Sequence, residues 1–275
     1  MKVSFVVFIG ILSCINLPAQ KQTPNGLNGK YATILGKSIY YEEYGKGPAL
    51  ILLQGGLKSI KDFSPCIPEL SKKFRIIAPD DPGQGRSQAL DTLIYDLLAE
   101  YVSKLIDELK LDSAYVLGWS DGGIAALILA AKRPDKVKRV IAVGANYAKS
   151  GYVSSGNSED TLQLIPPDYQ PPAEDQKWID GYFIANKAIW KKIMNDRKIM
   201  WAQEFCFPKE LFNEMKVPIL IVSGDHDIIR LSHTVEMHQL IKGSQLCVLP
   251  NTSHDVFSSR PGLVSSIVTD FLMNQ

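Results

Sequence analysis

The stretch "SAYVLGWSDGGIAALILAAKRP", residues 113–134, joins a short apolar run to an apolar helical run that ends near Pro134. Between the two runs, Gly118, Ser120 and Gly122 match the pattern G-x-S-x-G. A serine at such a strand-to-helix turn takes an unfavourable backbone conformation, and the flanking glycines leave room for the neighbouring strand and helix. The pattern therefore predicts that Ser120 is a nucleophile whose following helix presents backbone N–H groups to an oxyanion.

Outward from this turn, short apolar strands alternate with helical patterns. Continuous apolar runs of this kind indicate buried parallel strands, and the segment at residues 31–45 predicts a hairpin that turns near Gly36. The predicted parallel strands are "ALILLQGG" (49–56), "FRIIAPDDPG" (74–83), "VKRVIAVGAN" (137–146), "VPILIVSGDHD" (217–227) and "SQLCVLP" (244–250). The alternation predicts an α/β fold with a mostly parallel central sheet and helices on both faces.

Residues from about 147 to 212 interrupt this alternation. The segment is first rich in Ser, Gly and Pro, and then has helical spacing with many aromatic residues. We interpret it as a helical cap inserted into a single domain that spans residues 20–275. A cap commonly sets the substrate, so its aromatic residues are candidates for substrate contacts, although packing beneath the cap explains each of them equally well. These candidates are Tyr182, Phe183, Trp190 and Trp201.

A serine nucleophile needs a base and an acid that orients the base. Asp227 follows a predicted strand in a G-x-x-D arrangement, and His254 follows the last predicted strand. Asp225 competes for the role of the acid. The rival bases are His226 in the acid loop and His233 and His238, which we expect on a surface helix. Position favours Ser120, Asp227 and His254 as a catalytic triad.

The oxyanion needs two N–H donors. We assign them to the backbone of Gly56, in the loop after the first buried strand, and of Asp121, directly after the nucleophile. Gln54 stands in that loop, and we expect its amide to hold the loop by hydrogen bonds.

These residues together resemble the α/β-hydrolase superfamily from about Tyr31 to the C-terminus. The loop "DDPGQGRS" (80–87) fits that family's D-x-x-G-x-G-x-S turn, with Pro82 where arginine is common. The stretch that begins at "LGWSDGG" is similar to the valacyclovir-hydrolase (biphenyl-hydrolase-like) branch. That resemblance implies that the Asp121 carboxylate meets a substrate ammonium group. The alternative is that Asp121 caps its helix or pairs with a neighbouring loop.

The resemblance implies a serine hydrolase that cleaves carboxylic esters through an acyl-enzyme, without a cofactor or metal. Lactones, including macrolide-type lactones, and aminoacyl esters are candidate substrates. Hydrolysis of carbon–carbon bonds with the same triad, a perhydrolase side activity and ligand binding without turnover remain as alternatives. Epoxide and haloalkane hydrolysis are disfavoured, because the family members with those activities carry an aspartate nucleophile.

The N-terminus reads as an export signal over residues 1–19, with an apolar run that is short for a membrane span. The alternative is a lipobox that would leave Cys14 lipidated and the protein tethered to a membrane. The formal net charge of +1 provides no basic surface for nucleic acid. Cys66, Cys206 and Cys247 show no metal or redox spacing, and we expect them to be buried. The expected partner is a small-molecule ester in the periplasm or outside the cell, and no oligomeric state is predicted.

Overall fold

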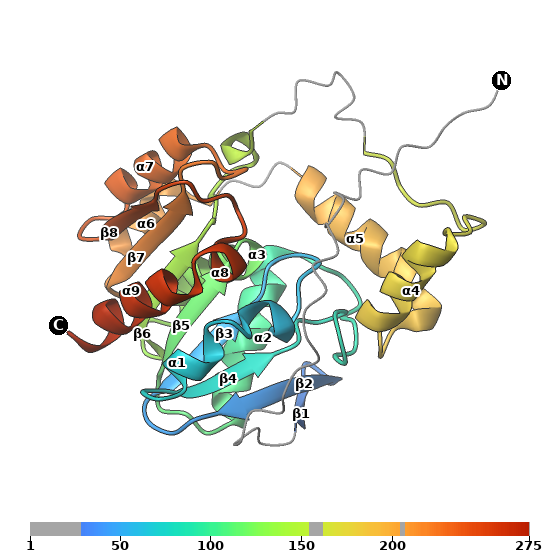
Figure 1. The fold of residues 1–275 in the computed structure, drawn as a ribbon, viewed down its shortest axis with the longest axis horizontal. Coiled ribbons are helices and arrows are strands. Elements are labelled where there is room, and N and C mark those ends of the chain that lie inside the picture. The colour runs from blue at the N-terminus through green and yellow to red at the C-terminus, as the bar shows by residue number, and fades with distance from the viewer. Residues whose placement is uncertain (1–28, 154–161, 204–206, 275) are drawn as a thin grey trace.

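The computed structural model describes residues 29–153, 162–203 and 207–274. Within them, an eight-stranded sheet runs in the order β1-β2-β4-β3-β5-β6-β7-β8, with helices on both faces (Figure 1). The strands are β1 (Lys30–Ile34), β2 (Lys37–Tyr44), β3 (Ala49–Leu53), β4 (Arg75–Pro79), β5 (Ala114–Trp119), β6 (Val137–Val143), β7 (Ile219–Gly224) and β8 (Gln245–Leu249).

The sheet is parallel from β4 to β8 and antiparallel only at its first edge. β1 pairs with β2 as an antiparallel hairpin, and β2 is antiparallel to β4. All later neighbours are parallel. The hairpin turns at Leu35 and Gly36, whose φ angles are 50° and 73°, and glycine takes such a positive φ without steric cost. The predicted hairpin and the predicted mostly parallel α/β fold are confirmed.

Two layers of helices bury opposite faces of the sheet, because successive residues of a strand point to opposite sides. In β3, Ile51 and Leu53 belong to one apolar core and Leu50 and Leu52 to the other. The first core is covered by α2 (Tyr95–Glu108), α3 (Asp121–Lys132), α6 (Lys209–Glu214) and α7 (Leu231–Leu240). The second is covered by the short helix Ile60–Phe63 and by α1 (Ile67–Leu70), α8 (Val256–Ser259) and α9 (Pro261–Met273).

The chain between β6 and β7 contains two helices that lie outside these layers, α4 (Ala173–Tyr182) and α5 (Trp190–Ala202) (Figure 1). Their shared apolar cluster packs against Leu57 and Ala89, which belong to the loops that follow β3 and β4. The cluster consists of Ile179, Tyr182, Phe183 and Ile193. Helix α6 lies within the segment that we interpreted as a cap, but it contacts α3 and α7. We call α4, α5 and their connection the cap.

The predicted signal at residues 1–19, Cys14 within it, and Cys206 lie outside the described residues. Across the ranges that the structure does describe, every helix is too short or too polar to cross a membrane. Cys66 is buried and Cys247 half-buried, both as free thiols.

Glycine permits β5, β3 and α3 to approach one another closely around the serine turn. A Cβ atom on Gly118 would lie 2.2 Å from the carbonyl oxygen of Gly122, and one on Gly122 would lie 2.4 Å from that of Leu53. Both obstacles are backbone atoms, so relief would require a strand or the helix to move.

Replacing Gly122 with alanine should therefore destabilise the protein. We expect Gly122→Ala to lower the free energy of unfolding by at least about 2 kcal/mol, measured by urea denaturation followed by circular dichroism. The control is Gly181→Ala on the exposed surface of α4, where a Cβ would meet nothing within 4 Å. That change should be neutral or should stabilise the protein by up to about 1 kcal/mol. Equal losses in the two variants would contradict the packing argument.

Candidate active site

Ser120 lies between the last residue of β5 and the first residue of α3. Its φ of 53° and ψ of −118° lie outside the regions that residues with a side chain normally occupy. Its N–H donates to the carbonyl oxygen of Val143 in β6 at 2.8 Å, and its own carbonyl accepts the N–H of Ile124 at 3.0 Å. These bonds hold the strained residue between strand and helix, and its side chain remains partly exposed.

His254 and Asp227 form a close pair at the carboxyl ends of the neighbouring strands. His254 Nδ1 lies 2.7 Å from Asp227 Oδ1, and the Asp227 side chain is fully buried while that of His254 is 18% exposed. Asp227 Oδ1 also accepts the N–H of Ile229 at 3.0 Å. The carboxylate is therefore fixed by backbone and directed at the imidazole.

The end of β6 brings this pair to the serine. Ser120 is bonded to Val143, and the next residue, Gly144, lies so close to His254 that a Cβ on it would be 2.8 Å from the ring atom Cε1. From the other side, Trp119 Nε1 donates to the backbone carbonyl of His254 at 3.0 Å. Trp119 and Gly144 thus place the His254–Asp227 pair beside the turn that carries Ser120.

Asp225 has a different environment from Asp227. Its carboxylate accepts the N–H groups of Asn251 and Thr252, both at 2.9 Å, and lies 2.9 Å from His226 Nδ1. The two backbone hydrogen bonds lower the pKa of Asp225 to about 2. Asp225 therefore ties the acid loop to the loop that carries His254, without contacting that imidazole itself.

The other histidines lie elsewhere. His226 is exposed beside Asp225, and His238 on α7 lies 2.8 Å from Ser244 Oγ through Nδ1. The expectation that His233 lies at the surface is wrong: its ring is buried and stacks on Tyr147 with the centroids 4.1 Å apart. His233 Nε2 accepts the N–H of Tyr147 at 3.2 Å, so the side chain packs α7 against the segment after β6.

The loop after β3 lies directly against the turn that carries Ser120. A Cβ on Gly55 would be 3.1 Å from the Cβ of Ser120, and one on Gly56 would be 2.5 Å from an Asp121 carboxylate oxygen. The two predicted oxyanion donors, the N–H groups of Gly56 and Asp121, therefore belong to segments in mutual contact. The expectation for Gln54 is wrong: its side chain is fully buried, and neither amide atom has a hydrogen-bond partner within the described residues.

The Asp121 carboxylate is buried and contacts three side chains. Arg197 Nη1 of α5 donates to Oδ2 at 2.7 Å, the Tyr95 hydroxyl donates to Oδ1 at 3.0 Å, and Trp201 Nε1 lies 3.1 Å from both oxygens. Both members of the Asp121–Arg197 ion pair are 1% exposed. A substrate ammonium would have to displace Arg197 to reach this carboxylate. The partners of Asp121 thus come from α2 and from α5 of the cap. From the sequence we considered instead that Asp121 caps the N-terminus of its own helix or pairs with a neighbouring loop.

Comparison with known proteins places this geometry in a family. The family profile described as the alpha/beta hydrolase fold matches residues 48–204, which is more than half of the chain. The chain belongs to the α/β-hydrolase family. Within the described residues of this hydrolase, no group of three or more His, Cys, Asp and Glu side chains is placed to hold a metal ion.

Individual relatives agree with this placement. Human Serine hydrolase BPHL is 29% identical over 258 residues, which cover 86% of this chain and 84% of its own. The pimeloyl-[acyl-carrier protein] methyl ester esterase of Nitrosomonas europaea is 26% identical over 252 residues, covering 82% and 95%. The solved enol-lactonase from Burkholderia xenovorans LB400 superposes with a TM-score of 0.69 at 23% identity, covering 89% and 100%, a likeness that shows the fold. The hydrolase lies near the biphenyl-hydrolase-like branch, as the sequence resemblance implied.

The four predicted cap aromatics of this hydrolase lie at different depths. Trp201 reaches Asp121, the residue after Ser120. Tyr182 is buried with its hydroxyl on Gln84 Oε1, and Phe183 is fully buried in the cap cluster. Trp190 is half-buried and contacts Tyr169 edge-on. Trp201 is thus the one of the four that contacts a residue of the serine turn, whereas Tyr182 and Phe183 pack the cap.

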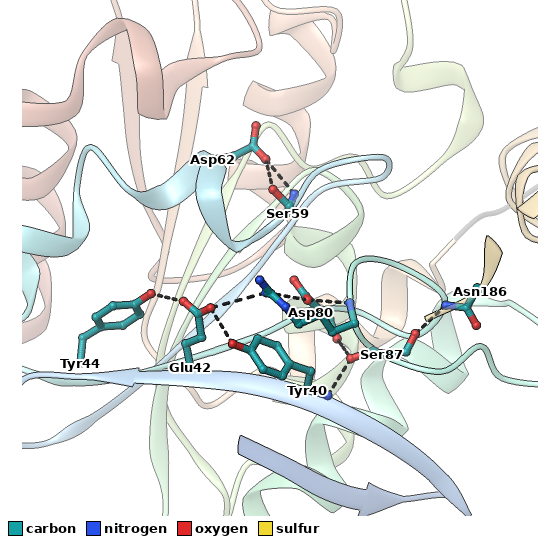
Figure 2. Close-up of polar contacts among 9 residues, drawn as sticks. Tyr40, Glu42, Tyr44, Ser59, Asp62, Asp80, Ser87 and Asn186 are labelled. Carbon is teal, nitrogen blue, oxygen red and sulfur yellow. Dashed lines mark hydrogen bonds and ion pairs between the residues drawn. The ribbon is translucent and has the colours of Figure 1, made fainter. Parts of the chain in front are cut away.

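The D-x-x-G-x-G-x-S loop holds the cap to the sheet (Figure 2). Ser87 Oγ donates to the carbonyl of Asp80 at 2.6 Å and accepts the N–H of Tyr40 in β2 at 2.9 Å. Asp80 Oδ2 accepts the N–H of Arg86 at 2.9 Å. Asn186 of the cap donates through Nδ2 to the Ser87 carbonyl at 2.7 Å. This loop thus connects the edge of the sheet to the cap.

Asp81, in the same loop, is a buried acid that the sequence did not single out. Its carboxylate accepts the Tyr101 hydroxyl of α2. Burial raises the pKa of Asp81 to about 7, although Tyr101 and the charge of Arg197 oppose this. Burial likewise raises the pKa of the neighbouring Asp80 to about 6. At a pH between the ordinary pKa of aspartate and these raised values, the folded hydrolase therefore keeps protons on the Asp80 and Asp81 carboxyl groups that the unfolded chain releases.

This retention predicts a pH dependence of stability. Unfolded, Asp81 loses its proton near pH 4, and folded it keeps the proton up to about pH 7. The folded state binds more protons in that interval, so stability should fall as the pH rises through it. We expect Asp81→Asn, which keeps an acceptor for Tyr101, to lose less thermal stability than the wild type between pH 5 and pH 8.

The measurement is the Tm by differential scanning fluorimetry at a series of pH values. The control is Asp168→Asn, a change at an exposed residue, which should keep the wild-type decline. If the Asp81→Asn curve ran parallel to that of the wild type, the proposed source of the decline would be wrong.

Proposed function

We propose that this α/β hydrolase is a serine hydrolase that cleaves carboxylic esters through an acyl-enzyme. The observation that carries the proposal is the convergence of a strained Ser120 with a fixed His254–Asp227 pair. A pure binding protein does not need a strained serine beside an oriented imidazole. The names of two relatives, a serine hydrolase and a methyl ester esterase, add support.

Each residue has a role in this mechanism. Asp227 holds Nδ1 of His254, which leaves Nε2 to take the proton from the Ser120 hydroxyl. The Ser120 oxygen attacks the ester carbon, and the N–H groups of Gly56 and Asp121 stabilise the oxyanion. His254 gives the proton to the departing alcohol, and water, activated by the same imidazole, then releases the acid and frees Ser120.

The residues of the cap suggest a class of substrate, and the N-terminal residues suggest where the protein is located. An aromatic cap residue, Trp201, beside the serine turn suits a partly apolar acyl or alcohol group. Lactones, including macrolide-type lactones, and aminoacyl esters remain candidates. We also propose that the protein is exported, to the periplasm or outside the cell, or tethered through a lipid on Cys14. Intact-mass measurement of the mature N-terminus separates these two routes.

The nucleophile is tested by active-site labelling. Wild-type protein should react with a fluorophosphonate probe and hydrolyse short esters, and Ser120→Ala should do neither, because the reacting oxygen is gone. Mass spectrometry of the labelled peptide locates the adduct. Equal labelling of the variant, or none of the wild type, would mean that the proposed function is wrong.

The choice of acid is tested by a matched pair of neighbouring carboxylates. Asp227→Asn should lower kcat by about 10⁴-fold, as the same change does in a serine-protease triad, because it spoils the orientation and tautomer of His254. Asp225→Asn should change kcat comparatively little, since Asp225 does not contact that imidazole. Steady-state ester hydrolysis measures both, with circular dichroism to check folding. A larger loss in Asp225→Asn than in Asp227→Asn would reverse the assignment.

A further inference from the structure

Arg197 has a guanidinium group that is buried beside the reaction site but only partly bonded. It projects from α5 of the cap, its side chain is 1% exposed, and Nη1 donates to Asp121 Oδ2 at 2.7 Å. The other two nitrogens, Nε and Nη2, are buried and have no hydrogen-bond partner within the described residues. The sequence did not point to this residue.

The two unpartnered nitrogens are the ones that bind a carboxylate together. In arginine the Nε–H bond and one Nη2–H bond run parallel along one edge of the planar group, and this edge matches the two oxygens of a carboxylate. Arg133 shows the filled state in the same protein: its Nε and Nη2 each donate to one oxygen of Asp135 at 2.9 Å. In Arg197 this edge has no partner within the described ranges.

An empty edge in this position is energetically unfavourable. Buried N–H groups of a charged side chain that lack an acceptor lose their hydration without compensation. The charge of Arg197 is already balanced by Asp121. This ion pair gives Nη1 its acceptor but provides none for Nε and Nη2. Asp81, the other acid near Arg197, uses its carboxylate to accept Tyr101. Within the described residues the protein offers no acceptor to Nε and Nη2, so a bound ligand would satisfy them.

Arg197 lies close to the residues that we propose carry out the reaction. Asp121, its partner, directly follows Ser120, and a Cβ on Gly56 of the oxyanion loop would lie 3.3 Å from Arg197 Nη1. Trp201, four residues along the same helix, also contacts Asp121. Arg197 is thus linked to Ser120 through one intervening residue, Asp121.

We infer that Arg197 binds a free carboxylate of the substrate, so that the enzyme prefers esters that also carry a carboxylate. This inference rests on the proposed function and names its substrate class, such as the monoesters of dicarboxylic acids. Hydrolysis consumes one water and yields an acid and an alcohol, and the recognised carboxylate is unchanged. Because Nε and Nη2 are enclosed, the substrate enters when α5 moves away from the serine turn and is held when α5 returns.

This substrate class differs from the aminoacyl esters that the family resemblance implies. An ammonium group would compete with Arg197 for Asp121, whose two oxygens are already in contact with three side chains. A carboxylate would supply the acceptors that Nε and Nη2 lack within the described residues, and it would leave Asp121 with its three partners.

The experiment compares two esters that differ only in charge. Monomethyl esters of straight-chain dicarboxylic acids of graded length are paired with their carboxamide analogues, and acid release is followed in a pH-stat with full-length wild-type protein. An aminoacyl methyl ester and its desamino analogue complete the panel. At the best length, kcat/KM for the carboxylate should exceed that for the carboxamide by about ten- to hundredfold, as expected for charge-assisted hydrogen bonds. A ratio near one at every length would overturn the inference.

Substitution of Arg197 separates recognition from a merely structural role. Arg197→Lys keeps a positive charge for Asp121 but removes the parallel pair of donors. It should bring the ratio close to one while hydrolysis of the carboxamide ester continues. Equal losses on both esters with the ratio unchanged would show that Arg197 only holds the cap, and would overturn the inference. Arg133→Lys is the control and should keep the wild-type ratio.

Two further measurements keep the inference testable if Arg197→Lys does not fold or if the wild type does not hydrolyse these esters. If Arg197→Lys does not fold, Asp121→Asn with Arg197→Gln removes both charges and should likewise abolish the ratio. In Ser120→Ala, calorimetry should show tighter binding of the monomethyl ester than of its carboxamide, whether or not the wild type turns it over. Equal binding overturns the inference alone, whereas absence of fluorophosphonate labelling overturns only the proposed function.

Discussion

The positive φ of Ser120 is the constraint on which the site depends. A residue with a side chain keeps such a conformation only if its surroundings hold it there. Here β6 accepts its N–H, α3 donates to its carbonyl, and glycines at 118 and 122 allow β5, β3 and α3 to pack against the turn. The same close approach brings the loop after β3 to the serine from one side and the loop of His254 from the other.

A second interaction joins the cap to this turn. Burying an ion pair removes both charges from water, and the cost is offset only when the remaining polar atoms are also bonded. The carboxylate of Asp121 meets that condition, with Tyr95 and Trp201 beside Arg197. The guanidinium does not, because two of its nitrogens have no acceptor within the described residues. The proposed recognition of a substrate carboxylate by α5 rests on this asymmetry.

Several features could be predicted from local patterns, and others could not. The alternation of apolar strands with helices indicated the sheet, and the spacing of Gly118, Ser120 and Gly122 indicated the turn, because both signals are contained in neighbouring residues. His233 and Gln54 were misjudged for one reason: burial and bonding depend on what another segment places beside a side chain. His233 is covered by Tyr147, and within the described part of the chain no donor or acceptor reaches the Gln54 amide. Arg197 stands between Asp196 and Lys198, in a stretch that reads as an exposed helix face.

The sequence alone therefore determined the α/β-hydrolase fold, the place of the serine turn and the order of Ser120, Asp227 and His254 along the chain. These follow from periodicity and from the steric needs of individual residues. Tertiary structure decided which of two nearby carboxylates meets His254, that Asp121 faces a cap arginine, and that two nitrogens of this arginine have no partner among the described residues. Such outcomes depend on contacts between segments far apart in the chain, such as the 76 residues between Asp121 and Arg197, and no local pattern encodes them.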